Sequence, residues 1–192
     1  MDLGILKQIN WVDIFALIIL IRTSYIATRN TLPIELFKLL GTAAAVYLSL
    51  HYYIAFSSFL KDNFGINIPF KFLEFSSFLI LAMLGYVIFF LARWLFYRFL
   101  KIEAVPDLER WGALILSIAR GILLAGFVLF ILVFTNLNYF KNSVRDSYSG
   151  KILIEVPVVT YSSLWDGVMS KFFTTEKFNK SVLEVQETLS HK

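Results

Sequence analysis

Four long apolar runs follow one another along the chain, separated by short polar breaks. Their approximate limits are residues 11–28, 34–60, 72–98 and 110–136. A bilayer core about 30 Å thick needs about 20 helical residues at about 1.5 Å per residue, so most of these runs are long enough to cross one. Since backbone groups in lipid must bond within their own segment, the pattern predicts an all-α integral membrane protein with a small bundle of four transmembrane helices.

The first run is the least apolar of the four. Asp13 and Arg22 enclose an uninterrupted apolar core of only eight residues, from Ile14 to Ile21. We therefore expect an uncleaved first span that is tilted, partly re-entrant or buried against other helices. Thr31 and Pro33 then favour the start of the second helix, with Thr31 as its cap.

Small residues recur at steps of four in two of the runs. In the second run they are Gly41, Ala45 and Ser49, and in the fourth they are Ala113, Ser117, Gly121 and Ala125. Small side chains allow helix backbones to approach closely in a membrane, so both stripes are predicted to be helix-packing faces.

After residue 136 the chain becomes more polar. Residues 1–137 are therefore predicted to form the transmembrane domain and residues 138–192 an extramembrane tail, with an amphipathic helix at about 160–174. Apolar residues recur there with the spacing of one helix face: Tyr161, Leu164, Trp165, Val168, Met169 and Phe172. Three roles are open to this face, namely contact with the membrane surface, docking on the bundle and binding of a partner.

Composition supports a membrane protein. Hydrophobic residues make up 58% of the chain and its mean hydropathy is +0.70, values that ordinary soluble domains do not reach. The formal charge of +4 comes from cations at the ends of apolar runs rather than on one face, which argues for membrane topology and against nucleic-acid binding. The expected partners are the lipid bilayer and either other envelope proteins or further copies of the chain.

The cations in the short connections suggest an orientation. Six lie on one side of the membrane and three on the other: Arg22, Arg29, Arg93, Arg98, Lys101 and Arg110 against Lys7, Lys61 and Lys71. The positive-inside rule then places both termini outside the cytoplasm, a preference that Lys141, Arg145 and Lys151 at the start of the tail offset.

Residues for metal binding or nucleophilic catalysis are sparse. The chain has no cysteine, and its two histidines, His51 and His191, have no second ligand at metal-binding spacing. His51 is interpreted as a hydrogen-bonded bundle or interfacial residue. Neither a nucleophile elbow nor a phosphate loop is present, and Ser143, Ser147 and Ser149 are interpreted as loop residues. We expect no metal, no cofactor and no enzymatic activity.

Arg120 is the one charge between Trp111 and Thr135. Such a charge at the bilayer centre costs about 2.5 kcal/mol or more, so it normally faces protein or a cavity. On a helix it borders the face of Ala113 and Ser117, which directs it into the bundle. Glu35 is the nearest plausible carboxylate, so a structural Arg120–Glu35 pair is the preferred interpretation, with a role in conduction or substrate binding as the alternative.

Three short motifs resemble the colicin V production protein (CvpA) family of bacterial inner-membrane proteins. They are Asn10-Trp11-Val12-Asp13 at the first span, Arg29 followed by Pro33, Glu35, Leu39 and Gly41, and Asp107-Leu108-Glu109-Arg110-Trp111-Gly112 followed by Arg120-Gly121. The tail serines before an apolar helix fit as well. Asn30 and Ser117 stand where the family usually has glycine.

The resemblance implies a multi-pass protein of the bacterial inner membrane, involved in toxin production or export where a toxin exists and more broadly in envelope maintenance. We expect a scaffold or accessory component that acts through helix faces and the tail. The rival is a small channel or transporter in which Arg120, Glu35 and Asp13 line a path. Because four helices enclose little space, that rival requires several copies.

Overall fold

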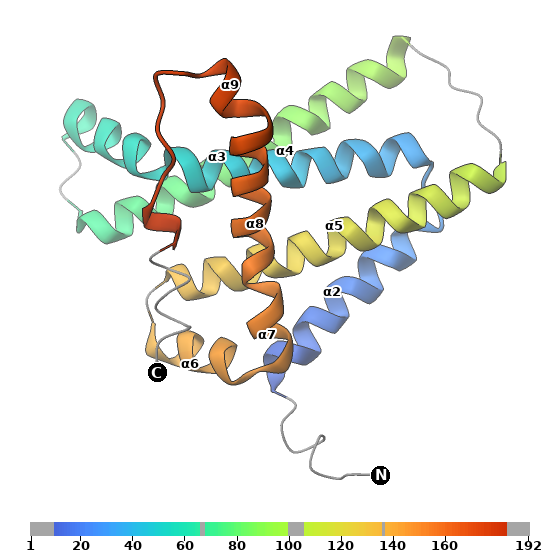
Figure 1. Cartoon of the computed structure of the whole chain (residues 1–192), viewed down its shortest axis with the longest axis horizontal. Helices are drawn as coiled ribbons and strands as arrows, with labels where there is room; N and C mark the ends of the chain where they lie inside the picture. Colours follow the sequence, from blue (N-terminus) through green and yellow to red (C-terminus); the bar gives the residue numbers. More distant parts are fainter. Residues whose placement is uncertain (1–9, 66–67, 100–105, 136, 184–192) are drawn as a thin grey trace.

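The computed structural model describes residues 10–65, 68–99, 106–135 and 137–183. Within these ranges the fold is all-helical, with no strand, as predicted. The four long helices are α2 (Trp11–Ala27), α3 (Leu32–Phe64), α4 (Phe70–Phe99) and α5 (Pro106–Phe134), shown in Figure 1. Each overlaps one predicted apolar run, with ends displaced by up to four residues. Lys7, Lys101 and His191 lie outside the described residues.

Helices α3 and α4 form an antiparallel hairpin. Gly65 ends α3 in the left-handed conformation, at φ 57°, and its N–H donates to the Lys61 carbonyl at 3.1 Å. At the hairpin's closest approach, a Cβ added to Gly85 would lie 2.7 Å from Ala45 Cα. The small-residue stripe of α3 therefore packs on α4, through a glycine that had not been singled out in the sequence.

The second small-residue stripe packs on a different helix. Ala113, Ser117, Gly121 and Ala125 are all buried on α5. Ser117 Oγ donates to the Thr23 carbonyl of α2 at 2.7 Å, and a Cβ on Gly121 would lie 2.5 Å from Thr23 Oγ1. The first stripe thus packs α3 against α4, and the second packs α5 against α2.

The tail is more helical than its polarity indicated. It forms α6 (Asn138–Asp146), α7 (Tyr148–Leu153), α8 (Glu155–Leu164), the π-helical turn η1 (Trp165–Met169) and α9 (Ser170–Phe172). Ser143 and Ser149 lie inside α6 and α7, and Ser147 caps α7 by accepting from the Gly150 N–H at 3.0 Å. The interpretation of Ser143 and Ser149 as loop residues is therefore wrong, whereas Ser147 does lie between two helices, and its side chain caps the second of them.

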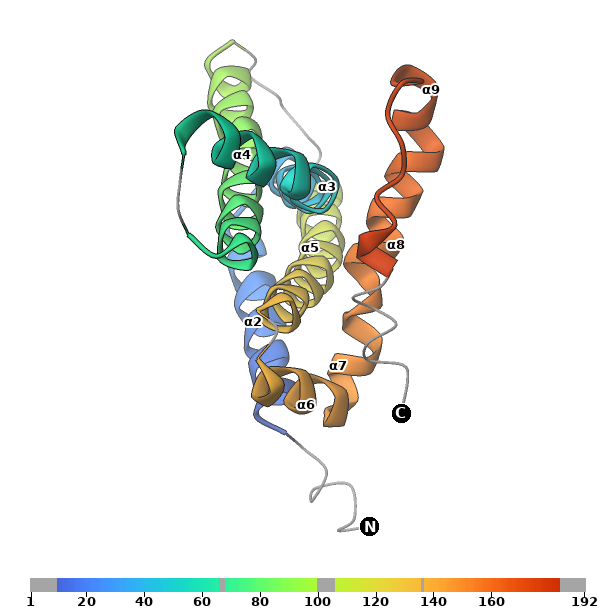
Figure 2. The same cartoon turned by 90° about the vertical axis from the view of Figure 1, so that its left-hand side faces the viewer.

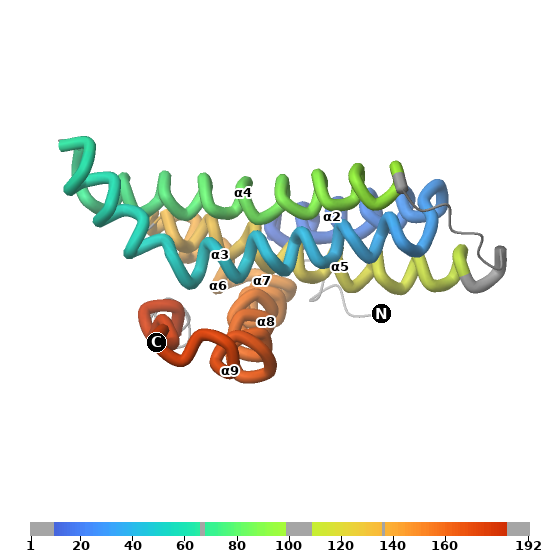
Figure 3. Tube along the Cα trace, turned by 90° about the horizontal axis from the view of Figure 1, so that it is seen from above, coloured from blue at the N-terminus to red at the C-terminus, as the bar shows by residue number. Residues whose placement is uncertain are grey.

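Among the described residues, four helical segments are long and apolar enough to cross a membrane. Three belong to α3, α4 and α5, and the fourth is Tyr148–Phe172, which falls in the segment predicted to be extramembrane. Figures 1 and 3 show that this fourth segment runs across α3 and α5 rather than along them, on the side of the bundle opposite α4. It therefore cannot cross a bilayer in the direction of those helices.

Helix α2 has 17 residues, the lower limit for a transmembrane helix. It packs along α5, and its first turn meets α6 and α7 (Figure 2). The chain is thus a multi-pass membrane protein whose long helices are in contact with lipid.

Candidate functional site

Arg120 and Glu35 lie next to each other inside the bundle. Arg120 Nη2 is 3.1 Å from Glu35 Oε2, the Glu35 side chain is fully buried, and Arg120 is 7% exposed. The contact is an ion pair by distance but not an aligned hydrogen bond, because Glu35 Oε2 and Arg120 Nε each lack a hydrogen-bond partner. Charge attraction at short range therefore dominates this contact.

Two further donors meet the other oxygen of the same carboxylate. Lys38 Nζ donates to Glu35 Oε1 at 2.8 Å, and Asn30 Nδ2 donates to it at 2.7 Å. Asn30, in the turn before α3, therefore adds a hydrogen bond to the buried acid. Sequence reasoning missed this role, although a polar residue five positions before Glu35 was a usable signal.

Ser117 connects this group to the first helix. Its hydroxyl donates to the Thr23 carbonyl and lies 3.5 Å from Arg120 Nη2. We call Asn30, Glu35, Lys38, Ser117 and Arg120 the Glu35 cluster. It joins α2, α3 and α5 around one buried carboxylate.

Asp13 ties the first helix to the tail. Its Oδ1 accepts from the Ser149 N–H at 2.7 Å and from Ser149 Oγ at 2.6 Å, while its Oδ2 accepts from the Asn10 N–H at 2.9 Å. Asn10 Nδ2 also donates to the Ser143 carbonyl at 2.7 Å. The aspartate and the tail serine, two features on which the family resemblance rested, are direct partners.

Replacing Asp13 with alanine is expected to release α7 from α2. Hydrogen bonds to a charged group contribute about 1.5–3 kcal/mol each, and the change removes two that link residues 136 positions apart. Hydrogen exchange in α7 should rise in Asp13→Ala and remain unchanged in Asp166→Ala, which removes an exposed aspartate of η1. Equal exchange in the two variants would show that the Asp13 contacts do not hold the tail.

The remaining motif residues do not join the Glu35 cluster. Arg29 is exposed and donates to Tyr25 Oη at 2.7 Å, and Arg110 is also exposed. Gly112 faces the Leu32 side chain, which a Cβ at this position would meet. The side chain of Asp107 lies outside the described part of the chain.

The apolar residues of the predicted tail face do not share one environment. Tyr161 and Trp165 are buried, Leu164 and Met169 are partly buried, and Val168 and Phe172 are 44% and 78% exposed. The π-helical turn adds a residue to one turn, so positions after it no longer continue the face that a regular α-helix predicts. Docking on the bundle accounts for the first part of the face only.

His51 makes hydrogen bonds through both ring nitrogens at the crossing of α3 and the tail. Its Nδ1 lies 2.8 Å from Tyr161 Oη, and its Nε2 lies 3.0 Å from Glu176 Oε2. Tyr161 Oη also accepts from the Asn179 N–H at 2.9 Å. Because a carboxylate only accepts, the Nε2–H of His51 donates to Glu176, and Tyr52 Oη donates to the same carboxylate at 2.8 Å.

A glycine of α5 allows the tail to cross closely. A Cβ on Gly126 would meet the Leu153 carbonyl oxygen and would lie 3.1 Å from Pro157 Cδ. Gly126 was not identified from the sequence because it lies one residue off the stripe ending at Ala125.

No three histidine, aspartate or glutamate side chains of the described residues lie together in a way that could hold a metal ion.

The family model described as colicin V production protein matches residues 12–157. That range contains Asp13, Glu35, Arg120 and Ser149, and it covers most of the chain. No curated protein and no solved structure matches the chain. The match over this range, which is more than half of the chain, means that the chain belongs to the colicin V production protein (CvpA) family.

Proposed function

We propose that this protein is a non-catalytic scaffold or accessory component of an envelope process in the bacterial inner membrane, including toxin export where a toxin is made. The observation that carries the proposal is the Glu35 cluster. Its carboxylate contacts a cation from α5 and a cation from its own helix, in a site with no exposed surface on Glu35. These charges thus stabilise helix packing rather than offer a binding surface.

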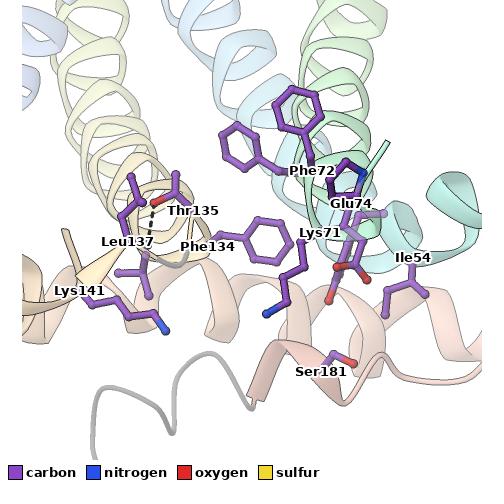
Figure 4. Close-up of a pocket in the computed structure, with 13 residues that line it drawn as sticks. Ile54, Lys71, Phe72, Glu74, Phe134, Thr135, Leu137, Lys141 and Ser181 are labelled. Carbon is purple, nitrogen blue, oxygen red and sulfur yellow. Dashed lines mark hydrogen bonds between the residues drawn. The ribbon is translucent and has the colours of Figure 1, made fainter. Parts of the chain in front are cut away.

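Two cavities in the described part of the structure support this assignment. They measure about 770 Å³ (Figure 4) and about 520 Å³, and neither is lined by Arg120 or Glu35. A conducting path built on the intramembrane charges would need open space beside them. The helices instead approach closely around the cluster, through Ser117 and Gly121 against Thr23.

A scaffold also needs surfaces that remain available after folding. Helix α4 packs chiefly on α3 and exposes large apolar side chains along its outer side, including Met83, Trp94 and Leu95. The far end of the tail exposes Val168 and Phe172. Lipid or another envelope protein can cover both surfaces.

The proposal can be tested by reconstituting the full chain in liposomes and measuring its mass in lipid nanodiscs. We expect particles too small to be closed rings of copies, and ion release no faster than from protein-free liposomes. A channel-forming peptide in the same lipid mixture is the positive control. A ring-sized homo-oligomer together with protein-dependent ion flux would overturn the scaffold assignment and support the channel.

A further inference from the structure

The outer side of the tail helix carries a face that no other described element covers. The segment Tyr148–Phe172 packs one side on α3 and α5, and Figure 2 shows α8 as the outermost layer on this side of the bundle. Ile152 and Val159 of its outer side are 57% and 59% exposed. Exposed residues at steps of three and four share this side, and we call them the tail face: Tyr148, Ile152, Glu155, Val159, Ser163 and Asp166.

The tail face lies at a depth where lipid chains are a poor cover for it. The tail crosses α3 at His51, 13 residues before that helix ends, and α5 at Gly126, eight residues before its end. Both crossings therefore lie about 12–20 Å inside candidate membrane spans. Charged side chains are costly in hydrocarbon, and exposed apolar ones are disfavoured in water. Since the tail face contains both kinds, protein is its best cover.

Membrane insertion restricts how two copies can bring their tail faces together. Two copies inserted in the same orientation are related in a symmetric dimer by a twofold axis along the membrane normal. The tail helix runs across the direction of the long helices (Figures 1 and 3), so this axis turns it end for end. The two tail faces then meet antiparallel, with Val159 of each copy at the axis.

The order of residues along the tail is self-complementary in this arrangement. Glu155 and Ser163 lie four positions before and after Val159, so each carboxylate faces a hydroxyl donor of the other copy. Lys151, exposed beside the face, lies eight positions before Val159, and Asp166 lies seven positions after it. These opposite charges have no ion-pair partner among the described residues, and they meet twice in the dimer.

We infer that the tail face binds the tail face of a second copy, giving a dimer with its twofold axis along the membrane normal. Val159 packs on Val159 at the axis, and Lys151 pairs with Asp166 towards both ends of the contact. A dimer is smaller than a ring of copies, so the inference goes beyond the scaffold proposal and is compatible with it. Because these contacts join two copies, single substitutions in the face leave the stability of the separated chain in micelles unchanged.

The absence of cysteine from the chain permits a direct test in lipid. Val159→Cys places one thiol per chain at the axis, where two copies bring their Cβ atoms within reach of a disulfide. Mild oxidation of the full chain in liposomes at a low ratio of protein to lipid should shift the mass on nonreducing gels from 22.2 kDa to twice that value. Met83→Cys, exposed on the outer side of α4, is the control and should stay monomeric. Equal cross-linking of the two variants would overturn the inference.

Charge exchange tests the pairing of the ends. Lys151→Glu sets like charges opposite each other at two symmetric places and should weaken dimerisation in liposomes about tenfold or more, as measured by energy transfer between labelled chains. Lys151→Glu combined with Asp166→Lys restores opposite charges and should recover dimerisation. Lys61→Glu changes an exposed lysine outside the tail and should have no effect. A double variant as weak as Lys151→Glu would overturn this arrangement of the two copies.

The mass of the unchanged chain in lipid nanodiscs separates failure of the dimer from failure of the scaffold. Twice 22.2 kDa supports the dimer even if Val159→Cys does not insert. Monomers would overturn the dimer and leave the scaffold proposal standing. Ring-sized particles with ion flux would overturn both, because a twofold contact between identical faces closes at two copies.

Discussion

Glu35→Leu is expected to destabilise the bundle by about 3–5 kcal/mol, the cost of leaving a buried charge without its partner. Arg120 would lose the carboxylate 3.1 Å away and keep only the Ser117 hydroxyl as a cluster contact. Lys38, 15% exposed at its side chain, can turn outward more easily than Arg120. Denaturant-dependent unfolding in mixed micelles measures the loss.

The double variant Glu35→Leu with Arg120→Leu should recover most of this stability, because it removes both charges and fills the site with apolar side chains. Glu155→Leu, which changes an exposed carboxylate of α8, is the matched control and should have little effect. If the double variant is no more stable than Glu35→Leu, the cluster does not act through the charge pair. That outcome would return Arg120 to the role of a conduction or substrate residue.

Gly85→Ala is expected to separate α3 from α4 locally and to cost about 1–3 kcal/mol, the usual range for overpacking. The new Cβ would lie 2.7 Å from Ala45 Cα and from Ala45 N, both of them backbone atoms. Ala45→Gly should therefore fail to rescue the variant, since it removes a side chain that is not the atom in the way. The same unfolding measurement tests both changes.

Two other glycines provide graded controls. A Cβ on Gly41 would lie 3.1 Å from Phe89 Cβ, so Gly41→Ala should cost less than Gly85→Ala. Gly167 has nothing within 4 Å, so Gly167→Ala should leave stability nearly unchanged. A Gly85→Ala variant as stable as Gly167→Ala would show that the hairpin does not depend on this close approach.

Local patterns predicted the four long helices because each is a long apolar run with a recognisable break. The hydropathy pattern does not show how the tail runs relative to the bundle. It placed Tyr148–Phe172 in the extramembrane tail, although this segment is apolar and long enough to span a membrane. Its course across α3 and α5 depends on contacts with Gly126 and His51, which no periodicity in the tail itself reveals.

In the candidate site, too, some contacts could be predicted from the sequence and others could not. The sequence was enough to predict that Arg120 lies near Glu35. The helical angle of Arg120 directs it into the bundle, and Glu35 lies in the same half of the membrane. The structure brings the two side chains together. Asn30 and Lys38 are close to Glu35 in sequence, yet a carboxylate with several neighbours does not reveal which of them it binds. The contacts of His51 with Glu176 and of Asp13 with Ser149 join residues 125 and 136 positions apart, so they follow from the fold alone.

The bond between Asp13 and Ser149 has a consequence for biogenesis. Asp13 is synthesised near the beginning of the chain, whereas Ser149 is synthesised only after α5 and α6. During that interval the carboxylate of α2 must stay hydrated or bind another donor, because an unpaired charge is costly in lipid. The contact between Asp13 and the tail serine can therefore form only after all four long helices have been synthesised, and a chain that stops before α7 leaves the Asp13 carboxylate without it.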